Sequence, residues 1–214
     1  MVITIGRQHG SNGHLIARAL AERLGYACYD KEIVDRAAED SPFSKEVVDS
    51  FDEKRVSPYF APNPHILGGG EGFQLNMRVA AAQFDAIRKL AENGNCIFVG
   101  RCADYILRSR KDLLRVFILA DDEFRVKTMM ERRGFTEDRA KKLVRQVDKD
   151  RSSYYKYYTD QIWGDPANFD LCINAGKLGV EATARLIADV VLGLEPAGIP
   201  EHPPELLPDP EDHN

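Results

Sequence analysis

The stretch VITIGRQHGSNGHLIARALAERLG, Val2–Gly25, decides how the rest of this 214-residue sequence is interpreted. An apolar run is followed by a loop with two glycines, and the loop is followed by Ile16, Leu20 and Leu24 at helical spacing. Backbone N–H groups at a helix start bind phosphate, and glycines let the chain turn closely around it. The loop nevertheless lacks the lysine of the G-x-x-x-x-G-K-[ST] motif. These residues alone leave two alternatives: a phosphate loop whose positive charge comes from elsewhere, or a strand–turn–helix corner without a ligand.

A phosphate at this loop would need cations beyond the helix start. An anion gains only about 0.3–1 kcal/mol from a helix N-terminus, or ~2 kcal/mol when partly buried, which is too little to hold a triphosphate. Arg7 and His14 are the nearest cationic candidates. Gly10 and Gly13 permit tight turning, and Asn12 tolerates a positive φ better than most residues.

The remaining chain predicts an α/β fold. Short apolar runs typical of buried strands lie at 2–6, 27–29, 96–100, 115–120 and 170–174, and helical patterns lie at 13–25, 76–95, 121–134, 136–158 and 178–194. Alternating strands and helices predict a mostly parallel five-stranded sheet with helices on both faces. Because ligands bind beyond the carboxyl ends of such strands, Arg7, Asp30, Lys31 and Arg101 become the residues of interest.

Composition narrows the class of protein. A net charge of −5 argues against general binding to nucleic acid polymers. No apolar stretch approaches the ~20 residues of a membrane span, and the N-terminus lacks the layout of a secretion signal. The four cysteines show no C-x-x-C spacing, so we expect neither a zinc site nor disulfides, and we expect most of them to lie in the core. The chain is therefore expected to be cytoplasmic, with no membrane partner.

We expect one domain at 1–193, with a Pro/Gly-rich acceptor-side insertion at about 40–76 and a basic lid region at about 132–160. Within the insertion, 57–73 is expected to be a loop. The Pro-rich acidic tail, 194–214, is expected to be disordered or laid across the surface.

Two further strings make the interpretation specific. The opening stretch, IFVGRCADYIL at Ile97–Leu107 and YYKYYTDQIWGDPANFDL at Tyr154–Leu171 together resemble the cytidylate kinase-like family of P-loop kinases, over most of 2–190. Members of that family typically show R-Q-x-G-S-G-G at the loop, so the missing lysine is a family feature. This chain departs from the pattern at Asn12, where glycine is usual, and at His14, where a larger basic residue is common.

The resemblance implies a three-layer P-loop kinase fold with a helical lid, and phosphoryl transfer from ATP to a small nucleotide, best CMP or dCMP. Mg²⁺ is expected on the nucleotide phosphates, with no direct protein ligand and a water bridge to Asp30 as an option. Two alternatives stay open: a nucleotide sensor or scaffold with little turnover, and a kinase for another small acceptor. The oligomeric state also stays open. The residues expected to bind the donor are Arg7, Gln8, His9, Gly10, Ser11, Asn12, Gly13 and His14.

On the acceptor side, Arg101 resembles the arginine of a G-R-D motif that holds the acceptor phosphate, with Asp104 near the base or sugar. The alternative is a surface ion pair between Arg101 and Asp104. Asp30 and Lys31 are expected to line the acceptor site, although Asp30 could equally cap the next helix.

The lid is expected to supply one or two catalytic cations. The residues expected to act in catalysis are Arg7, Arg101, Arg133, Arg145 and Arg151, with Arg151 the first choice within the lid. The tyrosines at 154, 155, 157 and 158 and Trp163 are expected to pack the lid helix against the body or a partner rather than to stack on a base.

Overall fold

The computed structural model describes residues 1–30, 33, 36, 39–44, 46, 48 and 71–194. Lys31, most of the insertion expected at 40–76 and all of the tail beyond Leu194 lie outside the described residues.

The core is a five-stranded, fully parallel sheet with strand order β2-β3-β1-β4-β5. The strands are β1 (Val2–Arg7), β2 (Ala27–Tyr29), β3 (Cys96–Val99), β4 (Leu113–Leu119) and β5 (Leu171–Asn174). β1 is central, and Ile5 is in register with Val99 of β3 on one side and Val116 of β4 on the other. The carboxyl ends of these three strands therefore lie next to one another.

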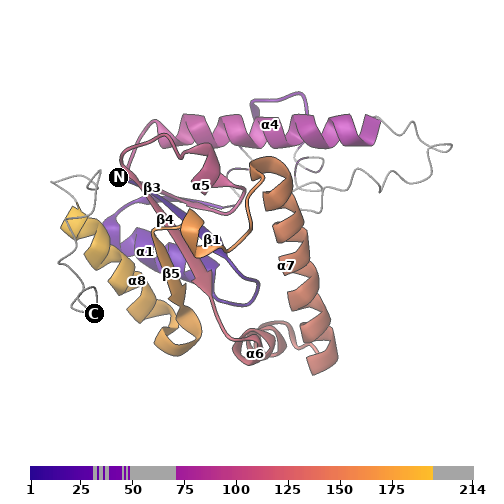
Figure 1. Cartoon of the computed structure of the whole chain (residues 1–214), viewed down its shortest axis with the longest axis vertical. Helices are drawn as coiled ribbons and strands as arrows, with labels where there is room; N and C mark the ends of the chain where they lie inside the picture. The colour runs from indigo at the N-terminus through magenta and orange to yellow at the C-terminus, as the bar shows by residue number, and fades with distance from the viewer. Residues whose placement is uncertain are drawn as a thin grey trace, which may run out of the picture.

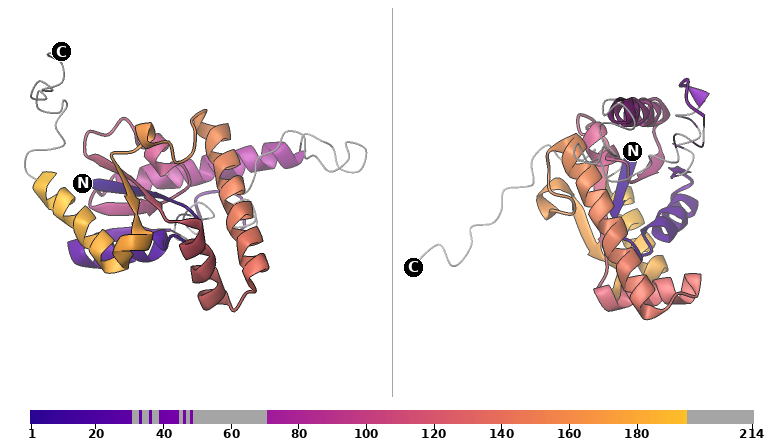
Figure 2. Two further views of the ribbon diagram at one scale, coloured as in Figure 1. Left: turned by 60° about the horizontal axis from the view of Figure 1, so that its bottom comes forward. Right: turned by 90° about the vertical axis from the view of Figure 1, so that its right-hand side faces the viewer.

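Helices cover both faces of the sheet, giving the three-layer architecture of P-loop kinases (Figures 1 and 2). The helices are α1 (Gly13–Leu24), α4 (Glu71–Ala91), α5 (Ala103–Ile106), α6 (Asp122–Arg133), α7 (Glu137–Thr159) and α8 (Ala175–Leu194). The apolar faces of α1 and α8 pack on Ile3 and Ile5, whereas α4 packs on Val2 and Phe98 from the opposite face. Alternate residues of a strand point to opposite faces, so both faces are buried.

Each predicted strand and helix is present in the structure, but the residues at which most of them begin or end differ from the prediction. α1 stops at Gly25, whose φ of 68° suits glycine, as the sequence predicts. α4 begins at Glu71, so the prediction of a loop through residue 73 is wrong. The helix extends because Leu75 packs one turn ahead of Val79 in the same apolar cluster.

α6 and α7 lie beside the carboxyl edge of the sheet, and α7 spans most of the region at about 132–160 that the sequence analysis interprets as a lid (Figure 1). They pack on each other through Val126, Met129 and Val144, while the C-terminal half of α7 packs on Cys102 and its neighbours. None of the helices in the described part of the chain is long and apolar enough to cross a membrane.

Candidate active site

The loop between β1 and α1 has the shape that a phosphate loop needs. Gly10 and Asn12 both have left-handed backbones, with φ of 81° and 67°. The amide of Ala120, just beyond β4, donates to the side-chain carbonyl of Gln8 at 3.1 Å, and the Ser11 hydroxyl donates to the carbonyl of Gln8 at 2.9 Å. Gln8 and Ser11, expected to contact the donor, therefore use these side-chain atoms to hold the loop onto β4.

Gly10 also permits close packing. A Cβ at this position would lie 2.8 Å from the backbone oxygen of Arg125, whereas a Cβ at Gly134, with φ of 64°, would meet nothing within 4 Å. We expect Gly10→Ala to lower the free energy of unfolding by about 1–3 kcal/mol more than Gly134→Ala, because both carry the φ penalty but only one collides with backbone. Chemical denaturation of the two variants measures the difference. Equal losses would show that α6 does not press on the loop.

Three arginines from separate segments line one small cavity beside this loop. Arg7 ends β1, Arg101 follows β3, and Arg151 lies on α7. Arg151 donates to the backbone oxygen of Arg7 at 3.1 Å, which fixes the lid helix to the start of the loop. The structure therefore brings together the lid arginine ranked first by sequence and the two strand-end arginines.

Asp30, directly after β2, links Arg101 to His14 at the start of α1. Arg101 donates to one of its oxygens at 3.1 Å, and His14 Nδ1 lies 2.7 Å from the other. Burial opposes ionisation of Asp30, but the charges of Arg7 and Arg101 and the hydrogen bonds from Arg101 and His14 outweigh it and lower its pKa. His14, expected to be a phosphate cation, thus lies against a carboxylate.

Arg101 and Asp104 do not form the surface ion pair considered as an alternative. Arg101 is 3% exposed and pairs with Asp30, while Asp104 accepts a 2.6 Å hydrogen bond from the Tyr155 hydroxyl. Burial raises the pKa of Asp104, and the hydrogen bond from Tyr155 only partly opposes this. Both residues line the same cavity as Arg7.

The backbone that carries Arg101 is strained. Gly100, Arg101 and Cys102 all have positive φ, of 77°, 53° and 56°. Each left-handed non-glycine residue costs about 1–3 kcal/mol and such residues cluster at ligand sites. The turn aims the Arg101 guanidinium back along β3, where it also donates to the oxygen of Val99 at 3.1 Å.

His9 lies in the middle of positive charge. Burial, and then the charge of Arg151, lower its pKa to about 4; the other contributing charges are Arg7, Arg133 and Arg125. His9 Nε2 and Asn12 Oδ1 are buried without a hydrogen-bond partner among the described residues. A neutral imidazole that carries its proton on Nε2 can donate to a phosphate oxygen among these guanidinium groups, whereas Asn12 Oδ1 is an acceptor and would need a donor instead.

The same shift makes stability depend on pH. Because the folded-state pKa of His9 lies below the ordinary histidine value of 6.5, the unfolded chain binds more protons between about pH 4 and 6.5. The His9 contribution is therefore complete above pH 6.5 and is lost as pH falls toward 4, by on the order of 1–2 kcal/mol after allowance for solvent screening. We expect the melting temperature of His9→Gln to depend less on pH than that of the wild type over this range, when both are measured in the same buffers. Parallel pH curves would contradict this.

Two residues that the sequence analysis missed hold the loop. Arg125, on α6, is buried and pairs with Asp148 and Asp122. Asp148, on α7, accepts from the backbone N–H of His9 at 2.7 Å. Charged residues on lid helices look solvated in a sequence, and the one available signal was that Asp148 precedes Arg151 by three residues and so shares its helix face.

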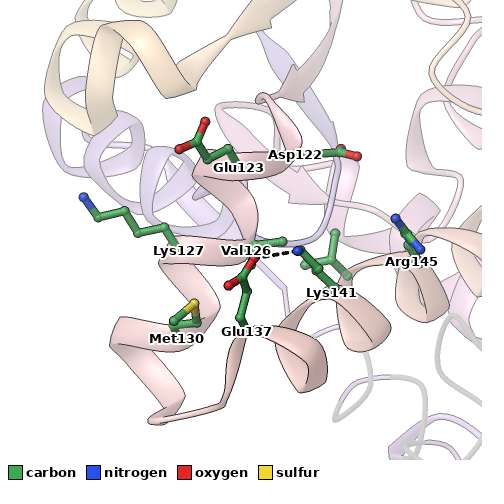
Figure 3. Close-up of a pocket in the computed structure, with 9 residues that line it drawn as sticks. Asp122, Glu123, Val126, Lys127, Met130, Glu137, Lys141 and Arg145 are labelled. Atoms are coloured by element: carbon green, nitrogen blue, oxygen red, sulfur yellow. Dashed lines mark ion pairs between the residues drawn. The ribbon is translucent and has the colours of Figure 1, made fainter.

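The two remaining lid candidates differ in position. Arg133 ends α6 and is exposed, but its charge still reaches His9. Arg145 lines a separate cavity of about 470 Å³ between α6 and α7, with Val126 and Met130 on its wall and the Glu137–Lys141 ion pair across it (Figure 3). Arg145 is not part of the cavity that holds the other three arginines.

The lid aromatics pack as predicted. Tyr154 and Tyr155, on α7, are buried against Cys102. Trp163, beyond the end of α7, meets Phe117 edge-on with ring centroids 5.3 Å apart, whereas Tyr157 is exposed. Within the described residues no group of three or more histidines, cysteines or carboxylates could hold a metal ion.

Comparison with known proteins places this site in a family. The model of the cytidylate kinase-like family matches residues 2–177. A crystal structure of an uncharacterized protein from Eubacterium ventriosum ATCC 27560 is 31% identical, with a TM-score of 0.69 over 89% of this chain and 98% of that one. A comparison with curated proteins finds no match.

More distant solved structures share the fold. Shikimate kinase from Bacteroides thetaiotaomicron is 13% identical, with a TM-score of 0.54 over 90% of this chain and 98% of that one. Shikimate kinase from Acinetobacter baumannii, solved with shikimate, is 12% identical, with a TM-score of 0.51 over 91% of this chain and 93% of that one. Likeness at this identity shows the fold alone.

Proposed function

The chain belongs to the cytidylate kinase-like family, and from this premise we propose that it transfers the terminal phosphoryl group of ATP to a nucleoside monophosphate, CMP or dCMP. The observation that carries the proposal is the meeting of Arg7, Arg101 and Arg151 around one cavity at the carboxyl edge of the sheet. Phosphoryl transfer depends on positioning and charge neutralisation, and this cluster supplies both.

The roles divide by segment. The amides of the loop at 8–13 and Arg7 hold the donor phosphates, Arg101 holds the acceptor phosphate, and Arg151 reaches the transferred group from α7. Arg101 suits its role because its guanidinium fork is buried and fixed by Asp30, so little entropy is lost on binding. Each arginine comes from a different element, so the cationic cage is complete only when the lid is in place.

Mg²⁺ arriving with the donor would neutralise part of the phosphate charge. Asp30 is a carboxylate at the strand ends that contacts Arg101, and it is proposed to approach the metal through water. Both Asp30 oxygens already face donors, Arg101 and His14, and these fix the orientation of the carboxylate.

No general base is assigned. The acceptor phosphate is already anionic near neutral pH, so its oxygen can attack in line without losing a proton. His9 remains neutral because burial and the surrounding arginines lower its pKa to about 4. It is proposed to donate one hydrogen bond to a phosphate oxygen.

The test is a coupled ADP-release assay with ATP, Mg²⁺ and a panel of acceptors: CMP, dCMP, UMP, AMP, GMP and shikimate. The proposal expects CMP or dCMP to give the highest kcat/KM. If ADP is released only with shikimate or a purine monophosphate, the assigned acceptor is wrong but the assignment as a kinase stands.

A nucleotide sensor with little turnover is the second candidate. The loop has no lysine, and one of its amides already holds the Asp148 carboxylate; both observations favour weak or regulated donor binding. Saturable ATP binding with no ADP release from any acceptor would select this function.

A further inference from the structure

A carboxylate of the chain itself occupies the loop where an anion should bind. Asp148 Oδ1 accepts the His9 N–H at 2.7 Å, and Asp148 Oδ2 pairs with the Arg125 guanidinium. Asp148 is 17% exposed and Arg125 is 7% exposed, so water screens this contact poorly. One backbone amide and one guanidinium on two oxygens is also how proteins hold a phosphate group.

Arg125 is built into the loop rather than attached to it. Its guanidinium also donates to the His9 carbonyl at 3.4 Å, and its backbone oxygen touches Gly10 closely enough to exclude a Cβ. Its Nε is buried without a hydrogen-bond partner among the described residues. Arg125 and the His9 amide are therefore donors that can bind an anion, and the Asp148 carboxylate is the anion that they contact in this structure.

Asp148 lies on α7, the helix that also carries Arg151. It lies three residues before Arg151, so both side chains leave the same face of α7 and reach the same loop. Asp148 binds a donor of the loop, the His9 amide, while Arg151 binds an acceptor, the Arg7 carbonyl. The two contacts together hold α7 against the loop.

We propose that the His9 amide and Arg125 form a phosphate-oxygen subsite and that Asp148 fills it as an internal competitor until a polyphosphate displaces it. This inference rests on the proposed function, because the competing ligand is its phosphate donor. Carboxylate and phosphate cannot accept the same N–H in the same geometry, so donor binding must release Asp148. The apparent affinity for the donor then falls by the fraction of molecules in which the subsite is free.

The test measures binding, with no turnover required. Inorganic triphosphate is titrated calorimetrically, at fixed salt and without Mg²⁺, into the full chain and into Asp148→Asn. The variant keeps the side-chain shape and removes the charge that pairs with Arg125. We expect it to bind about tenfold more tightly, the gain when a competing contact leaves about a tenth of molecules competent.

Asp150→Asn is the matched control. It removes the same charge from the same helix, but Asp150 contacts Gln146, at 2.9 Å, rather than the loop. If wild type binds and Asp148→Asn binds no more tightly than Asp150→Asn, the inference is wrong while the proposed function stands. If no form of the chain binds triphosphate, donor binding fails, and both are overturned.

A second measurement uses the wild-type chain and so does not depend on the variant folding. The side-chain carboxyl carbon of Asp148 is followed by NMR as triphosphate is added. We expect its resonance to move to that of a solvated carboxylate at saturation, together with a shift of the His9 amide proton. A carboxyl resonance that stays unchanged at saturation overturns the displacement.

Discussion

Replacing Arg151 with alanine lowers kcat by about 10³-fold or more, with a much smaller change in the KM for either substrate. A guanidinium that meets the transferred phosphoryl group acts chiefly in the transition state, where such a group contributes about 10³–10⁵ in turnover. Arg151 is the lid residue that lines the cavity with Arg7 and Arg101 and that contacts the loop. Steady-state kinetics with ATP and the best acceptor of the panel measure the loss.

Lys142→Ala is the control for Arg151. It removes a positive charge from the same helix at an exposed position outside the arginine cavity. We expect less than a threefold change, because an exposed, solvated charge is screened. Equal losses in the two variants would mean that the net charge of the lid, rather than the Arg151 guanidinium, supports turnover.

The second large effect is expected at Arg101. Arg101→Lys keeps a positive charge beside Asp30 but loses the planar fork, so we expect the KM for the acceptor to rise about 10- to 100-fold while the KM for ATP changes little. Lysine is preferable to alanine here. Arg101 is 3% exposed, and removing its charge would leave Asp30 with a broken buried ion pair.

Arg110→Lys is the matched control for Arg101. Arg110 also makes a two-point contact with a carboxylate, Asp112, at 3.0 and 2.9 Å, but it precedes β4 at the opposite edge of the sheet. We expect its kinetics to match wild type. An unchanged acceptor KM in Arg101→Lys, or a change of the same size in Arg110→Lys, would contradict the role assigned to Arg101.

The fold was predictable from the sequence because its signals are local. Val2–Ile5 and Cys96–Val99 are buried on both faces, and such strands appear as continuous apolar runs. Gly25 and Gly134 end their helices with left-handed backbones, as their positions predict.

The candidate site was predictable only in part, because its contacts join segments far apart in the chain. Arg7, Asp30 and Arg101 could be found, since each follows a strand and parallel strands end at one edge. Arg101 pairs with Asp30 rather than with Asp104, and this depends on the left-handed turn at 100–102. The residue types at these three positions do not predict that turn. Asp148 was missed because its loop partner is the backbone N–H of His9, and backbone groups carry no sequence signal. Arg125 was missed because its partners, Asp148 and the His9 carbonyl, lie far from it in the sequence.

The position of β1 between β3 and β4 has a consequence for how the acceptor specificity of such a kinase could change. The two arginines that would grip donor and acceptor end adjacent strands, whose spacing is ~4.8 Å in any sheet. The strand ends from which the two arginines extend are thus held by backbone pairing, independently of the segments proposed to read the acceptor. Changes in peripheral segments alone would then alter which acceptor is bound. The spacing between the ends of β1 and β3 would stay the same.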